Sequence, residues 1–280
     1  MNCYNGEKYV YEAINSVLSQ TYTNWELIFW DNLSTDKSKD VFFNFNDIRL
    51  KYKLSDNHTN LSEARIKAIK KSQGSLIAFL DVDDFWHKDK LEKQVSLFND
   101  KDIMFSCTSC KVIYENSNKR LDIEPPRSLS GQVFNELLEN YFVVLSSLMI
   151  RQYAYNATGG FSKKYHIIGD FDLVTKLALH GRCGIAHEFL TYNRKHDNNE
   201  SIIKSNIHSQ ELLEWKQCNV ELLNTANQNS RDKLIKNIEF SCIVNDINKK
   251  NVSIDTIRMC IRQKPLNILK AIFHFLNKYV

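Results

Sequence analysis

Apolar and polar residues alternate with two different periods over the first hundred residues. Apolar side chains at helical spacing predict amphipathic helices at residues 6–20, 34–45, 60–74 and 88–98. Short apolar runs that end in polar residues predict buried strands at residues 25–31, 48–54 and 75–81. Residues 1–6 resemble the end of a further strand, which either begins upstream or is unusually short. Strands that alternate with helices predict an α/β fold.

This alternation favours a Rossmann-like, mostly parallel central sheet that is flanked by crossover helices. In such a sheet, ligands bind beyond the carboxyl ends of the strands. Those ends are polar here, with the sequences NCYNG, WDNLSTD, SDNHTN and LDVDD. Asn and Asp also favour turns, so turn formation explains any one of these ends. All four ends together favour a shared ligand site at one edge of the sheet.

The pattern is less regular after residue 100. Apolar runs predict strands at residues 102–114, 142–150 and 183–196, and a helix that begins with two carboxylates at 169–181. From residue 205 onward the pattern is mostly helical. We therefore expect one domain at residues 1–204, with halves at 1–100 and 101–204, and a helical C-terminal extension at 205–280.

Three carboxylates lie within four residues at the end of the predicted strand at 75–81. On an extended chain, Asp81 and Asp83 would point to one face because they are two residues apart. Two carboxylates on one face suit Mg²⁺ or Mn²⁺, which usually complete their coordination with substrate phosphates. Without a cation, the three negative charges repel one another. The segment is therefore either a cation site or a solvated acidic turn.

Composition narrows the class of protein. Apolar residues make up 43% of the 280 residues and charged residues 25%, which is typical of a globular protein. A net charge of +4, from 37 basic and 33 acidic residues, does not favour nucleic acid as a partner. Cys107 and Cys110 form a C-x-x-C pair without the second pair that a structural zinc site needs. We expect core or surface thiols in a reducing, cytoplasmic setting, and no apolar run is long enough to span a bilayer.

Several ordered segments resemble the inverting family 2 glycosyltransferases, which have the GT-A fold. These segments are residues 2–36, 60–84 (which ends in the D-x-D motif), 158–181 and 190–201. The resemblance covers roughly residues 1–201 and does not extend to the helical tail. It implies that residues 1–100 bind a nucleotide sugar and that residues 101–204 bind the acceptor.

The resemblance also implies which residues contact the nucleotide sugar. Tyr4 matches an aromatic residue that packs beside the base, and Asn2 lies in the same segment. Asp31 and Asn32 stand where the family usually has two Asp residues that contact base and ribose. Asn32 keeps the hydrogen-bonding ability of Asp but loses its charge. Arg65 matches an Arg near the base and the diphosphate.

The remaining matches concern the metal and the catalytic base. Asp81 would contact the ribose, Asp83 would bind the metal, and His196 falls where some members place a histidine near the metal and the diphosphate. Asp170 matches the catalytic base, although Gly169 replaces the family's preceding Glu. Read from the residues alone, His196 is also compatible with a surface position and Asp170 with an N-terminal helix cap.

The implied reaction moves a sugar, with inversion, from a nucleotide-diphosphate sugar to an acceptor hydroxyl, with Mn²⁺ or Mg²⁺ as cofactor. A UDP-sugar is the favoured donor. The acceptor would be a glycan or a lipid-linked glycan in cell-surface polysaccharide biosynthesis, such as that of O-antigen or capsule.

Residues 262–280 mix basic and apolar residues. They predict either a peripheral contact with the inner face of the cell membrane or a helix that packs on the domain. Two other functions stay open: a non-catalytic nucleotide-sugar-binding protein of the same fold, and a nucleotidyltransferase. The latter usually has a Gly-rich phosphate loop, whereas the segment around the first strand offers only Gly6.

Overall fold

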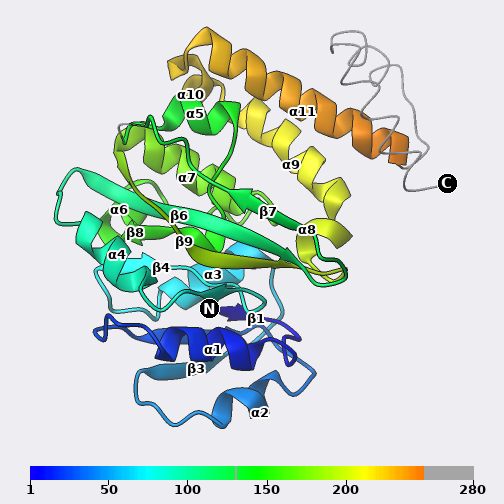
Figure 1. Ribbon diagram of the computed structural model, residues 1–280. Helices are drawn as coiled ribbons and strands as arrows, with labels where there is room; N and C mark the ends of the chain where they lie inside the picture. Colours follow the sequence, from blue (N-terminus) through cyan, green and yellow to red (C-terminus); the bar gives the residue numbers. More distant parts are fainter. Residues whose placement is uncertain (130, 249–280) are drawn as a thin grey trace. The chain divides into compact units, whose positions relative to one another are not determined.

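The computed structural model describes residues 1–129 and 131–248. The chain forms two compact units, whose elements Figure 1 shows in sequence colours. The first unit comprises Met1–Val133 and Phe142–Asp197, and the second comprises Phe134–Tyr141 and the chain from Asn198 onward. All the residues predicted for binding or catalysis lie in the first unit.

The first sheet has three parallel strands in the order β1-β2-β3. These are β1 (Asn2–Cys3), β2 (Leu27–Asp31) and β3 (Leu50–Leu54), connected by helices α1 (Val10–Leu18) and α2 (Ser38–Phe43). Cys3 lies opposite Asp31, and Asn2 also forms an isolated parallel bridge with Asp81. Three polar strand ends therefore meet at one edge, which confirms the shared edge predicted from the sequence.

The continuous apolar run of β2 reflects burial on both faces, because successive side chains of a strand point to opposite sides. Leu27 and Phe29 pack with apolar residues of α1 and α2. Ile28 and Trp30 pack instead against α3 (Leu61–Ile69). The packing of α3 on this strand fixes the helix that carries Arg65.

The second sheet has six strands and mixed directions. Its strands, in order across the sheet, are β4 (Leu76–Ala78), β8 (Met149–Arg151), β6 (Ile103–Tyr114), β9 (Arg182–Lys195) and β5 (Phe85–Trp86), with β7 (Arg120–Ile123) paired to β6. Strands β6 and β9 run parallel, whereas the other pairs of this sheet are antiparallel. The parallel arrangement expected from the sequence thus describes the first sheet, and the second sheet departs from it.

The strand predicted at residues 142–150 is shorter in the structure. A 3-10 turn, η1 (Leu145–Ser147), precedes β8. The amide and the hydroxyl of Ser147 both donate to the carbonyl oxygen of Val144, at 2.8 and 2.7 Å, which closes this turn. The remaining helices of the unit are α4 (Lys90–Leu97), α6 (Gln152–Ala157) and α7 (Gly169–His180).

The two cysteines of the C-x-x-C pair belong to the core. Cys107 and Cys110 are fully buried free thiols on β6, as expected for core thiols. Trp86, just after the acidic segment, is also buried, and its indole nitrogen donates to the carbonyl oxygen of Ser146 at 2.8 Å.

The second unit is helical, as predicted for the chain after residue 205. It contains α5 (Phe134–Glu139), α8 (Glu200–Ile203), α9 (Ser205–Cys218), α10 (Val220–Thr225) and α11 (Gln228–Asn248). Ser230 of α11 donates to Glu139 at the end of α5, at 2.7 Å. Within residues 1–129 and 131–248, no helix has the length and apolar character needed to cross a membrane. The predicted membrane-contacting segment, 262–280, lies outside the described residues.

A cavity of about 450 Å³ lies between β2 and β4. It exists because β1 pairs with only the last two residues of β2, while β4 is the edge of the second sheet. Ile28 lines the cavity from one side and Ala78 from the other, and its lining extends to Arg65 and Asp81. The cavity therefore borders the edge of the sheets at which the polar residues gather.

Candidate active site

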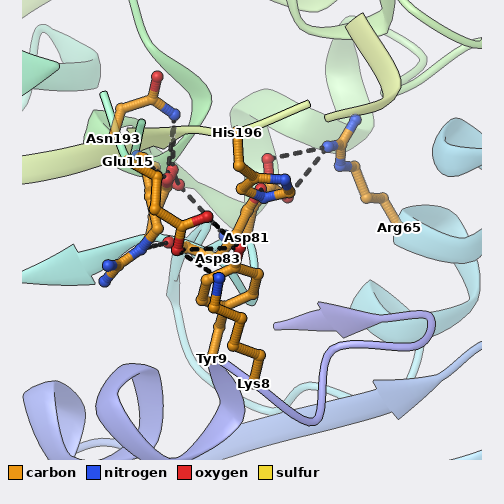
Figure 2. Close-up of polar contacts among 11 residues, drawn as sticks. Lys8, Tyr9, Arg65, Asp81, Asp83, Glu115, Asn193 and His196 are labelled. Atoms are coloured by element: carbon orange, nitrogen blue, oxygen red, sulfur yellow. Dashed lines mark hydrogen bonds and ion pairs between the residues drawn. The ribbon is translucent and has the colours of Figure 1, made fainter. Parts of the chain in front are cut away.

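The acidic segment forms a tight turn after β4. The amide of Asp84 donates to the carbonyl oxygen of Asp81 at 3.0 Å, so the chain reverses across Val82 and Asp83. The extended geometry that the spacing of Asp81 and Asp83 suggested is therefore wrong. The two carboxylates instead have different partners, one from α3 and one from the end of β9 (Figure 2).

The side chain of Asp84 bonds this turn to η1 and β9. This side chain is buried and accepts hydrogen bonds from the Ser146 hydroxyl, the Asn193 amide at 3.0 Å and the Arg194 backbone N–H at 2.9 Å. Burial raises the pKa of Asp84 well above its usual value, and the nearby charges of Asp83 and Asp81 raise it further. Asp84 is thus a structural support rather than a group that faces a ligand.

Asp81 pairs with Arg65 across the edge of the first sheet. An Nη atom of Arg65 lies 3.1 Å from Asp81 Oδ1 and 3.4 Å from Oδ2. Helix α3 brings Arg65 here because Asn60 caps its start, accepting from the Glu63 N–H at 2.8 Å. Beside this pair, Asn2 has a buried amide nitrogen that finds no hydrogen-bond acceptor among the described residues.

Asp83 pairs with His196, which immediately follows β9. The Nε2 atom of His196 lies 3.1 Å from Asp83 Oδ2. The guanidinium of Arg194 donates to the carbonyl oxygen of Asp83 at 3.0 Å, so β9 also holds the backbone of the turn. The structure therefore brings together the two residues that were predicted as metal ligands.

This pair fits a cation that is shared with a phosphate group. One carboxylate and one imidazole are donors that Mn²⁺ accepts, and carboxylates with phosphates suit Mg²⁺. In the part of the chain that the structure describes, no group of three or more His, Cys, Asp or Glu side chains is arranged to hold a metal by itself. Asp83 and His196 would therefore need further oxygen ligands from a bound diphosphate or water.

The predicted base-contacting residues at the ends of β1 and β2 differ in exposure. Asp31 is 1% exposed and accepts from the Tyr52 hydroxyl at 2.6 Å and the Ser34 N–H at 2.7 Å. Tyr4 is 46% exposed, and its ring lies 4.3 Å from that of His58. Only the Tyr4 ring of this set presents a broad surface to a base.

Asn32 is 4% exposed, and its side chain is already used within the fold. Its amide donates to the Thr59 carbonyl oxygen at 2.8 Å and accepts from the Thr59 N–H at 3.2 Å. The contacts of Asp31 and Asn32 with a nucleotide stay predictions. In the structure the Asp31 side chain bonds to Tyr52 of β3, and that of Asn32 bonds to Thr59 in the segment that follows β3.

Asp170 lies in the first turn of α7 and is partly exposed. The amide groups at a helix start favour an ionised carboxylate, which suits a proton acceptor. Asp172 is buried and pairs with Lys176 at 2.6 Å, so it serves the helix rather than a ligand. Gly169 has a packing role, because a Cβ atom there would collide with the Ser62 hydroxyl of α3.

Sequence reasoning missed the residues that hold the acidic turn. Ser146, Asn193 and Arg194 contact the turn, but none carries a recognisable motif by itself. The available signal was position: Asn193 and Arg194 lie three and two residues before His196, at the polar end of a predicted strand. Ser146 offered no such signal, since it lies inside an apolar run.

The chain belongs to glycosyl transferase family 2, whose family model matches residues 1–159. Among curated relatives, it is 33% identical over 151 residues to the putative teichuronic acid biosynthesis glycosyltransferase TuaG of Bacillus subtilis, which covers 52% of this chain and 58% of TuaG. It is 36% identical over 140 residues to the UDP-Glc:alpha-D-GlcNAc-diphosphoundecaprenol beta-1,3-glucosyltransferase WfgD of Escherichia coli, covering 50% and 54%. The matches thus span little more than half of each relative.

Solved structures agree on the fold. The S. aureus TarS fragment 1-349 in complex with UDP-GlcNAc superposes with a TM-score of 0.66 at 16% identity, covering 93% of this chain and 77% of that one. The mannosyltransferase PcManGT from Pyrobaculum calidifontis, in complex with GDP-Man and Mn²⁺, gives a TM-score of 0.59 at 16% identity, covering 99% and 79%. At this identity the likeness establishes the GT-A fold, which confirms the fold class predicted from the sequence.

Proposed function

We propose that this protein is an inverting glycosyltransferase that moves a sugar from a UDP-sugar to a hydroxyl group of a lipid-linked glycan. The observation that carries the proposal is the turn at Asp81–Asp84, on which one carboxylate pairs with Arg65 and another with His196. A guanidinium beside Asp81 and an imidazole beside Asp83, on the same turn, support binding of a diphosphate together with a cation. The turn lies at the sheet edge where α/β folds bind ligands.

We assign the candidate residues to different parts of the bound donor and its cation. Tyr4 and Asn2 would contact the nucleoside, while Arg65 and Asp81 would bind the diphosphate and the ribose. Asp83 and His196 would hold Mn²⁺ or Mg²⁺, which when bound neutralises the charge of the leaving diphosphate. That PcManGT binds Mn²⁺ with a nucleotide sugar supports this assignment.

Asp170 would act as the general base. It would take the proton from the acceptor hydroxyl while that oxygen bonds to the anomeric carbon of the sugar. The bond between the anomeric carbon and the diphosphate oxygen breaks in the same displacement, so UDP leaves with the electron pair and the anomeric configuration inverts. No covalent enzyme intermediate is required.

The names of the curated relatives support a place in cell-surface polysaccharide biosynthesis. WfgD is named for a UDP-glucose donor and a diphosphoundecaprenol acceptor, and TuaG for teichuronic acid biosynthesis. An acceptor of this kind is anchored in the membrane, so we propose that the protein works as a cytoplasmic enzyme at the inner membrane face. The division into a catalytic domain at 1–204 and a helical region at 205–280 is part of the same proposal.

The test is metal-dependent release of UDP by purified protein from UDP-glucose and UDP-GlcNAc, with and without a lipid-diphosphate-sugar acceptor. We expect Asp170→Asn to reduce turnover by about 10²- to 10⁴-fold, the usual contribution of a general base. Asp83→Ala should raise the Mn²⁺ concentration needed for turnover. Asp89→Asn is the matched control, because this carboxylate lies just beyond the turn and pairs with His87.

Two results would contradict the proposal. Full turnover by Asp170→Asn would remove this residue from the role of base. Binding of UDP and Mn²⁺ by the wild type without turnover of any common sugar nucleotide would favour the non-catalytic binding protein instead.

A further inference from the structure

Tyr9 contacts Arg194, near the end of β9, and His196, directly after it. Both of these residues also contact Asp83. The Tyr9 ring stacks on the His196 imidazole, with 4.9 Å between ring centres and 21° between planes. The guanidinium carbon of Arg194 lies 5.2 Å from the centre of the same ring. Because Arg194 and His196 are two residues apart at the end of an extended segment, they present their side chains on one face. Tyr9 covers that face from the start of α1.

The Tyr9 ring is itself held at its far end. Its hydroxyl donates to Glu115, at 3.1 Å from Oε2 and 3.3 Å from Oε1. Glu115 follows the last residue of β6, and its N–H donates to the Lys195 carbonyl oxygen at 2.9 Å. Lys8 completes the group with an ion pair to Glu115 at 2.7 Å. Figure 2 shows Lys8, Tyr9, Glu115 and His196 around Asp83, with their hydrogen bonds and ion pairs as dashed lines.

The position of His196 indicates what these contacts do to its imidazole. His196 is the first residue after β9 ends, so its imidazole lies just beyond the last paired residue of the strand. A ring that stacks on the imidazole restricts its rotation and keeps Nε2 directed toward Asp83. Hydrogen-bonding partners that orient a metal-ligating histidine typically change metal affinity by about 10- to 100-fold when they are removed, and we expect an effect of similar size from the stacked ring.

We propose that Tyr9 is a positioning residue that holds the His196 imidazole in its metal-binding orientation, and that Glu115 fixes the Tyr9 ring for this task. The inference rests on the proposed function, because it requires His196 to bind the cation. It goes beyond that function by making the start of α1 and the end of β6 part of the cation site.

The experiment measures the affinity of the full chain for Mn²⁺ in the presence of UDP, by titration of free Mn²⁺ with electron paramagnetic resonance. Tyr9→Ala should weaken Mn²⁺ binding by about 10- to 100-fold. Tyr9→Phe keeps the stacked ring and should recover most of the affinity. Tyr11→Ala is the matched control, because Tyr11 lies two residues further along in the first turn of α1, is 62% exposed and contacts the Phe45 ring.

A double-mutant cycle separates positioning from general damage. In a His196→Ala background, Tyr9→Ala should cause no further loss of Mn²⁺ affinity, since the ligand it orients is gone. Melting temperatures establish that each variant is folded, and Tyr9→Leu replaces Tyr9→Ala if the smaller side chain prevents folding. An equal loss with and without His196 would overturn the inference, as would unchanged Mn²⁺ binding by Tyr9→Ala and Tyr9→Leu.

The two proposals fail in distinguishable ways. If the wild-type protein binds no Mn²⁺ with UDP present, the cation part of the proposed function fails and the inference falls with it. If the wild type binds Mn²⁺ and His196→Ala does not, but the Tyr9 variants bind normally, only the inference is overturned.

Discussion

The guanidinium of Arg65 lies 3.1 Å from the carboxylate of Asp81, and each residue owes its position to a different part of the first unit. Arg65 comes from α3, which packs on one face of β2, while Asp81 begins the acidic turn after β4. The Arg65 side chain is 8% exposed and that of Asp81 is 36% exposed. The open side of the pair therefore belongs to Asp81, where a ligand can approach.

Replacing this guanidinium should weaken nucleotide binding. Arg65→Lys keeps the charge but loses the planar group that can bond two oxygen atoms at once. Because one hydrogen bond to a charged group is worth about 1.5–3 kcal/mol, we expect the affinity for UDP to fall about 10-fold or more. Isothermal titration with UDP measures this change, and Lys67→Met on the same helix serves as the control. Unchanged UDP affinity in Arg65→Lys would remove Arg65 from the donor site.

Restoring a side chain at position 169 should destabilise the protein. A Cβ atom at Gly169 would meet the Ser62 hydroxyl, which donates to the Tyr165 carbonyl oxygen. We expect Gly169→Ala to lower the free energy of unfolding by about 1–3 kcal/mol, as overpacking usually does. Urea denaturation measures it.

The same site offers a compensating change. Ser62→Ala removes the hydroxyl and leaves Ser62 Cβ 3.6 Å from the new methyl group, an ordinary contact distance. Gly169→Ala should therefore cost less in the Ser62→Ala background than alone. Equal costs in both backgrounds would show that Ser62 does not limit the residue at position 169.

Lys90 should make stability depend on pH. Its side chain is fully buried, and burial lowers its pKa to about 7. The pKa of a lysine in an unfolded chain is about 10.4. Between these values the unfolded chain binds more protons than the folded chain. The free energy of unfolding should therefore rise with pH by up to about 1.4 kcal/mol per pH unit, and this contribution should level off below about pH 7.

Denaturation curves of Lys90→Met and of the wild type, measured from about pH 6 to about pH 10, test this. The variant should lack the slope that the wild type shows. Lys93→Met, on the same helix but 53% exposed, should keep it. A slope of the same size in Lys90→Met would assign the pH dependence to other groups.

The cavity between β2 and β4 should accept additional apolar volume. Ala78 lines it and lies on a strand, where a β-branched residue is favoured. We expect Ala78→Val to raise the free energy of unfolding by about 0.5–2 kcal/mol, as cavity-filling substitutions commonly do. Ala186→Val is the opposite case, because Ala186 is buried on β9 outside this lining and should be overpacked. Destabilisation by both variants would mean that the cavity is not open to a larger residue.

Local patterns predicted much of the fold, because the apolar periods of the first hundred residues reflect real burial. The run at β2 is apolar throughout since helices cover both of its faces, and the polar ends of β1, β2 and the segment at Asp81 meet as expected. Strand directions in the second sheet were not predictable in the same way. They depend on pairings between β6, β8 and β9, which lie far apart in the sequence.

Family motifs identified the candidate site residues but not their partners. Asp83 and His196 are 113 positions apart, and their contact depends on β9 ending beside the acidic turn. The support that Asp84 receives from Ser146 and Asn193 comes from tertiary packing, which no local pattern encodes. Gly169 illustrates the same point. The sequence shows only the loss of a Glu, whereas the structure shows that a Cβ atom at this position would collide with the Ser62 hydroxyl of α3.

The buried carboxylate of Asp84 makes the acidic turn part of one cooperative folding unit. It bonds the turn to β9 and to η1, so the turn cannot open locally without breaking contacts of the six-stranded sheet. Many ligand-binding loops lie at the least stable end of a protein, and their amide hydrogens exchange quickly with solvent. Here the amides of the acidic turn should exchange nearly as slowly as those of β9. A donor would meet a turn that is already ordered, so binding requires little loss of conformational entropy there.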